Sequence, residues 1–80
     1  MINWRDHIHS NEGILLGKPV IKGTRISVEF ILERLANGWT EPQLFDNYPR
    51  LTKDDLQAVF AYTYECMKDG MLYTQEMKRA

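Results

Sequence analysis

The pattern of apolar and polar residues changes character near Ser27. Before that residue, apolar runs of two or three residues alternate with closely spaced glycines and a proline, which is typical of short strands and extended loops. β-Branched residues flank Lys22-Gly23, and a glycine adopts positive φ at little cost, so the sequence predicts a tight hairpin joining strands at 20–21 and 24–26. Residues 1–26 are therefore expected to form an N-terminal β element.

After Ser27 the apolar residues recur at helical spacing. Ser27 can cap a first helix, and Asn37-Gly38 is a helix-stop signal. The apolar stripe of this helix occupies positions i, i+3, i+4 and i+7, which are Val28, Ile31, Leu32 and Leu35. A helix with a buried side and a solvated side is expected here.

Two capping boxes, in which a cap residue and the third helical residue bond each other, predict a second and a third helix. Thr40 pairs with Gln43 in the first box and Thr52 with Asp55 in the second, while Pro49 prevents the second helix from continuing. The predicted core stripe of the third helix is Leu56, Val59, Phe60, Thr63 and Met67.

The predicted fold class is mainly α with a short N-terminal β-hairpin. Residues 27–69 are expected to form a three-helix helix-turn-helix of the winged-helix or homeodomain-like type, and residues 70–80 a C-terminal tail, within a single domain over 1–80. A plain three-helix bundle is the alternative, since crossing angles depend on packing that a sequence does not reveal.

Composition narrows the class of protein. A chain of 80 residues has a thin core, so we expect a homodimer. Its net charge is −1, so the surface as a whole lacks the excess of positive charge that binding of nucleic acid needs.

The single cysteine and the short apolar runs predict the location of the protein. One cysteine excludes an intrachain disulfide, and no apolar run approaches the about 20 residues that span a bilayer. We therefore expect a cytoplasmic protein without a membrane partner.

Residues with reactive or metal-binding side chains are few. His7 and His9, with Cys66 far away in sequence, fall short of the ligand set that zinc needs, so no metal site is predicted. No catalytic constellation and no phosphate-binding loop is present, and we expect neither an enzyme nor a cofactor.

A basic segment and an apolar tail are the candidate binding sites. Lys18, Lys22 and Arg25 fall within eight residues without an acid between them, on the predicted hairpin, where they could contact DNA or a partner. The alternative is a solvated turn without a binding role. The predicted helices contribute mostly carboxylates to any DNA-facing surface, which disfavours base reading by the helix-turn-helix itself.

Two tyrosines and the tail favour a protein partner. Tyr62 and Tyr64 cannot share one face of the third helix with Cys66, so at least one tyrosine is expected to point outward. The tail is too short to fold alone and carries apolar residues that need a docking surface, namely Met71, Leu72, Tyr73 and Met77.

The run GKPVIKGTRI at 17–26, with YPRLT at 48–52, closely resembles the bacterial domain-of-unknown-function 433 family. The resemblance extends over about residues 4–67. The residues that match the signature of the family are Gly17, Lys18, Pro19, Gly23, Thr24 and Arg25. This resemblance implies a helix-turn-helix or winged-helix-like fold behind a β element.

The same resemblance implies a function. It suggests a small antitoxin-like protein, often encoded beside a nuclease toxin of the PIN-like class, which it neutralises. The alternative hypothesis is a helix-turn-helix DNA-binding transcriptional regulator that represses its own operon by binding promoter DNA.

Overall fold

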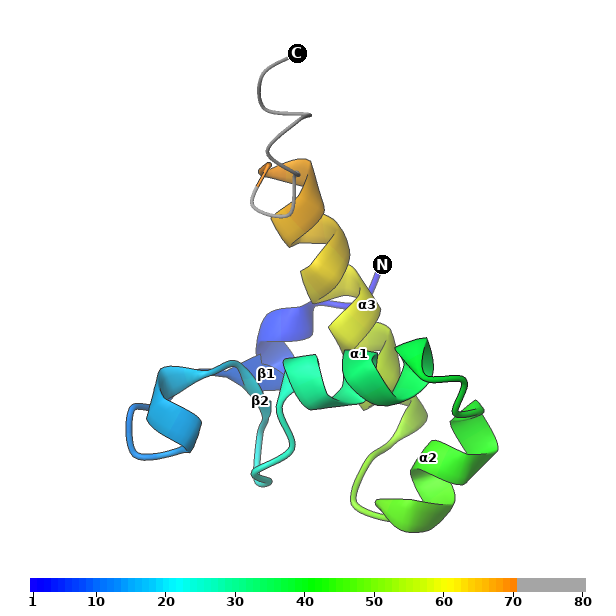
Figure 1. Ribbon diagram of the computed structural model, residues 1–80. Coiled ribbons are helices and arrows are strands. Elements are labelled where there is room, and N and C mark those ends of the chain that lie inside the picture. Colours follow the sequence, from blue (N-terminus) through cyan, green and yellow to red (C-terminus); the bar gives the residue numbers. More distant parts are fainter. Residues whose placement is uncertain (71–80) are drawn as a thin grey trace.

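Three α-helices and a two-stranded sheet make up residues 1–70, the part of the chain that this computed structural model describes (Figure 1). The elements in chain order are η1 (Trp4–Asp6), β1 (Ile8–His9), η2 (Leu15–Gly17), β2 (Val20–Ile21), α1 (Val28–Ala36), α2 (Glu41–Asn47) and α3 (Lys53–Lys68). The predicted fold class, mainly α with three helices behind a short N-terminal β element, is confirmed. None of these helices is long and apolar enough to cross a membrane.

The helix boundaries follow the predicted caps. The Ser27 hydroxyl accepts a hydrogen bond from the Phe30 N–H, and both capping boxes, at Thr40 and Thr52, are complete. Gly38 follows α1 with φ of 92°, a conformation that favours glycine because it has no Cβ. These local signals set where each helix begins and where α1 ends.

The predicted hairpin is confirmed in its turn and, by a short antiparallel pairing, across it. Thr24 N–H donates to Ile21 O, Gly23 has φ of 77°, Ile21 N–H donates to Ile26 O, and Val20 forms an antiparallel bridge to Ser27. The ladder partner of β2, however, is β1, with Ile8 opposite Ile21. A local turn signal identifies the turn but not which distant segment completes the sheet.

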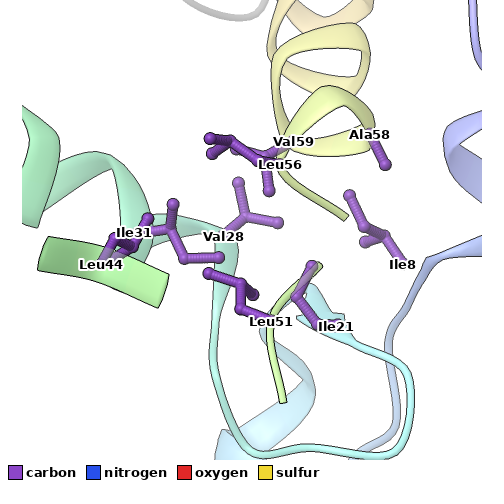
Figure 2. Close-up of a cluster of buried hydrophobic side chains, with 9 residues drawn as sticks. All are labelled: Ile8, Ile21, Val28, Ile31, Leu44, Leu51, Leu56, Ala58 and Val59. Atoms are coloured by element: carbon purple, nitrogen blue, oxygen red, sulfur yellow. The ribbon is translucent and has the colours of Figure 1, made fainter. Parts of the chain in front are cut away.

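The core lies where the sheet, α1, the start of α3 and one residue of α2 meet (Figure 2). Ala58 is directed toward Ile8, and Val59 lies on the side of Val28. The buried cluster consists of Ile8, Ile21, Val28, Ile31, Leu44, Leu51, Leu56, Ala58 and Val59. The predicted stripe of α1 is confirmed in this cluster, with Leu32 and Leu35 packed against it.

The predicted core stripe of α3 is wrong at two positions. Phe60 and Met67 are exposed, whereas the small residues Ala58 and Ala61 are buried. The N-terminal segment covers this side of α3, and alanines allow its backbone to approach the helix closely. The spacing of apolar residues alone does not show which of the two apolar stripes of α3 is covered by the rest of the chain.

Polar contacts hold the N-terminal segment against α3. Trp4 Nε1 and Arg5 Nη2 both donate to Glu65 Oε2, at 3.1 and 3.2 Å. His7 Nδ1 lies 2.9 Å from Asp55 Oδ1 and is the donor, because a carboxylate oxygen only accepts. The Trp4 ring also meets Tyr62 edge-on, with centroids 4.8 Å apart. The first and last described elements are thus joined side by side (Figure 1).

Candidate functional site

The largest side chains that α3 leaves in solvent lie on one face of the helix. Phe60, Tyr64 and Met67 are 40%, 54% and 51% exposed. They occupy positions i, i+4 and i+7, which share one side of an α-helix. We call these three residues the α3 stripe. A folded chain that leaves such a row in water has a surface suited to an apolar partner.

The chain terminus extends this apolar surface. A hollow of about 260 Å³ lies beside the α3 stripe, and it is lined by Met1, Ile2, Gln57, Phe60, Ala61 and Tyr64. Met1 is almost fully exposed. The outward orientation predicted for at least one tyrosine of α3 is confirmed by Tyr64.

Tyr62 occupies a different side of α3 and contacts Cys66. Burial raises the pKa of the Tyr62 phenol, and the neighbouring Cys66 thiol raises it further through a hydrogen bond and through charge repulsion. Both residues line an apolar groove of about 330 Å³ between α1 and α3, which also includes Val28 and Leu32. Cys66 is a free thiol of intermediate exposure.

The three cations of the predicted basic hairpin differ in their contacts. Lys18 Nζ lies 2.9 Å from Glu29 Oε1 in an exposed ion pair, so its charge is partly balanced by α1. Lys22 and Arg25 are exposed, and neither takes part in an ion pair within residues 1–70. Lys22 and Arg25 are therefore the two cations of this segment whose charge no ion pair balances within the described residues.

The signature residues around these cations mainly build the loop. Thr24 Oγ1 donates to Ile21 O and accepts from the Ile26 N–H, so its hydroxyl is used inside the turn. Gly17 and Gly23 both have positive φ. The carbonyl of Pro19 accepts from the Val28 N–H and fastens the loop to the start of α1.

Sequence reasoning missed Arg50. This residue lies in the link between α2 and α3, and its Nη1 donates to the Gly23 carbonyl at 3.0 Å. The hydrogen bond brings a second guanidinium to the turn that carries Arg25. The YPRLT run contained the only signal of this residue, but 27 positions separate Arg50 from Gly23.

The other predicted binding segment is the C-terminal tail. The predicted tail residues Met71, Leu72, Tyr73 and Met77 lie outside the described part of the chain. Within residues 1–70, no group of three or more His, Cys, Asp or Glu side chains is arranged to hold a metal ion. The exposed residues Glu41, Asp46 and Asp54 place carboxylates on α2 and the first turn of α3.

Comparison with known proteins identifies the family. Residues 8–63 match the family described as "Protein of unknown function (DUF433)". A crystal structure of a DUF433 member protein from Anabaena variabilis is similar, with 29% identity and a TM-score of 0.74 over 81% of this chain. The match covers 64% of the chain in that crystal structure, and no curated protein matches the sequence. Because the matched residues include most of the sheet and of the three helices, the chain belongs to the DUF433 family of proteins of unknown function.

Proposed function

We propose that this protein is an antitoxin-like inhibitor that binds a nuclease of the PIN-like class in the cytoplasm and keeps it inactive. It acts by binding and not by catalysis. The observation that carries the proposal is the α3 stripe, the row of Phe60, Tyr64 and Met67 that the fold leaves exposed. The nuclease partner is taken from the antitoxin-like character that the hairpin signature suggests.

The residues of the α3 stripe have the spacing found on helices that bind in a groove of a partner protein. Such helices present anchors at i, i+4 and i+7, and aromatic anchors often dominate the binding energy. Burial of one large apolar side chain contributes about 1.5–3 kcal/mol. Three anchors on one rigid helix, with Met1 beside them, provide a surface for a stable complex with another protein.

Base reading by the helices is less well supported than protein binding. Glu41 and Asp46 are exposed on α2, and Asp54 is exposed in the first turn of α3. These carboxylates repel the phosphates of DNA. The alternative function, a DNA-binding regulator that uses α2 or α3 as its recognition helix, therefore has the weaker case.

A growth-rescue assay tests the proposal. A nuclease of the PIN-like class, the proposed partner, is expressed alone and together with the wild-type chain, which should restore growth. The variant Phe60→Ser/Tyr64→Ser/Met67→Ser should fail to restore growth, because it removes all three anchors while leaving the buried residues intact. Circular dichroism confirms that the variant keeps its helices.

Leu16→Ser is the matched control. Leu16 is 95% exposed and lies in η2, away from the stripe, so its loss removes an equally apolar surface residue and should leave rescue unchanged. Rescue by the triple variant at the wild-type level would overturn the proposal. Light scattering on the purified chain and on the complex tests the expected homodimer separately.

A further prediction concerns the predicted tail. Residues 71–80 follow α3 in sequence and carry Met71, Leu72, Tyr73 and Met77, which we propose extend the contact with the nuclease. Deleting 71–80 should weaken the complex, measured by calorimetry, without changing the helical content of the rest. An unchanged affinity would limit the interface to the α3 stripe.

A further inference from the structure

A hollow of about 440 Å³ lies at the turn that follows β2, where segments far apart in sequence meet. Its lining residues are His9, Ile14, Gly23, Thr24, Arg25 and Arg50. No carboxylate belongs to this lining, and two guanidinium groups do. The turn lies at the opposite end of the molecule from the C-terminal half of α3, so this hollow is separate from the α3 stripe (Figure 1).

Arg50 is held in place at the hollow. Its Nη1 donates to the Gly23 carbonyl, which anchors one arm of the planar guanidinium and leaves other N–H groups of the fork for a ligand. Arg25 faces the same hollow from the turn itself. Within residues 1–70 neither arginine is paired with a carboxylate. Two unpaired guanidinium groups around one hollow attract an anion.

His9 also lines the hollow. Its Nε2 is buried and has no hydrogen-bond partner within the described residues. Because this atom is buried, it does not open into the hollow, and His9 contributes to the wall of the hollow without contacting a ligand there. The Thr24 hydroxyl already donates and accepts within the turn.

We propose that this hollow binds a phosphate group, held between the guanidinium groups of Arg25 and Arg50. A carboxylate has two oxygens and is satisfied by one arginine fork, whereas a phosphate group has enough oxygens for two forks. Lys22, exposed in the same turn, adds to the positive potential. The phosphate can come from a small phosphorylated molecule or from a nucleic-acid backbone, and the site does not depend on the proposed function.

NMR titration of the full chain with inorganic phosphate tests the site. Saturable shifts are expected for the amides of Gly23, Thr24 and Arg25 and for the ring of His9. Arg25→Gln should weaken phosphate binding about tenfold or more, because it removes charge-assisted hydrogen bonds without removing any contact recorded in the fold. Arg50→Gln should have a similar effect, and Arg50→Lys should restore part of the affinity through charge alone.

Lys18→Gln is the matched control, since it removes a signature cation that is paired with Glu29 outside the hollow. It should leave phosphate binding unchanged. Absence of saturable binding, an equal loss in Lys18→Gln, or equally tight binding of acetate would each overturn the proposal.

A short mixed-sequence DNA duplex distinguishes the two sources of phosphate. If the duplex binds more tightly than inorganic phosphate and Arg25→Gln weakens both, the site takes a backbone phosphodiester. If only inorganic phosphate binds with this dependence on Arg25, the site takes a small phosphorylated molecule. Either result supports the phosphate site, and neither depends on rescue from a nuclease.

Discussion

Two neighbouring sides of α3 differ in the size of their apolar residues. The side that faces the N-terminal segment buries the small residues Ala58 and Ala61, while the next side leaves Phe60, Tyr64 and Met67 exposed. The large α3 residues Leu56 and Val59 are buried in the core, where burial of apolar area stabilises the fold. The difference indicates that the large residues of the α3 stripe are used for something other than the core of this chain.

The small side also carries the polar contacts of the fold. Asp55 and Glu65 on α3 accept hydrogen bonds from His7, Trp4 and Arg5. The buried side of α3 thus specifies how the chain closes on itself, and the exposed side is left for a partner.

The largest expected effect on the free energy of unfolding comes from substituting a buried residue of α3, compared with an exposed one. Leu56→Ala should lower the free energy of unfolding by about 2–5 kcal/mol, because it leaves a cavity in the core. Phe60→Ala should cost only about 0.5–1 kcal/mol, since its ring is 40% exposed. Urea unfolding followed by circular dichroism measures both values.

A Phe60→Ala cost as large as that of Leu56→Ala would contradict this comparison. The stripe would then belong to the core, and the proposed role of Phe60 in binding would lose its main support.

An intermediate effect tests the polar contacts of the small side. Asp55→Ala removes the acceptor for His7 and half of the capping box with Thr52, so it should lower the free energy of unfolding by about 1–3 kcal/mol. Asp54→Ala, at the neighbouring exposed position, should change it by about 0.5 kcal/mol or less. Equal effects of the two substitutions would show that neither the His7 contact nor the capping box of Asp55 stabilises the fold.

The smallest effect concerns Tyr62, which packs edge-on against Trp4 of the N-terminal segment. Its raised pKa means that the folded chain holds the phenol proton more tightly than the unfolded chain. This contribution to stability is fully present below the unfolded pKa of about 10 and is lost as pH rises beyond it, because the unfolded chain deprotonates first. Tyr62→Phe should remove this alkaline loss, and Cys66→Ala should reduce it.

Unfolding in urea between neutral and alkaline pH measures the Tyr62 effect. Parallel pH profiles for wild type, Tyr62→Phe and Cys66→Ala would contradict it.

Local features of this fold were predictable from the sequence. Ser27, Thr40 and Thr52 cap helices through bonds to residues three positions away, and Gly38 stops α1 through its own φ. Each of these depends on a few consecutive residues. The few residues that form each cap or stop are therefore all visible in the sequence, and the structure confirms these features.

Features that depend on distant contacts were not predictable in the same way. The spacing of α3 is compatible with either apolar stripe facing inward, and only the position of the N-terminal segment decides between them. Likewise, the pairing of β2 with β1 joins segments that no local turn signal connects. Arg50 reaches Gly23 because the link between α2 and α3 passes close to the turn after β2. The spacing of apolar residues in the sequence does not predict the path of this link.

The pairing of the first and last described elements has a consequence for biosynthesis. Trp4, Arg5 and His7 leave the ribosome well before their partners on α3, which lie 48 to 61 positions later. The nascent chain therefore cannot close its fold until α3 has emerged as far as Glu65. Until then the hydrogen bonds between the N-terminal segment and α3 cannot form.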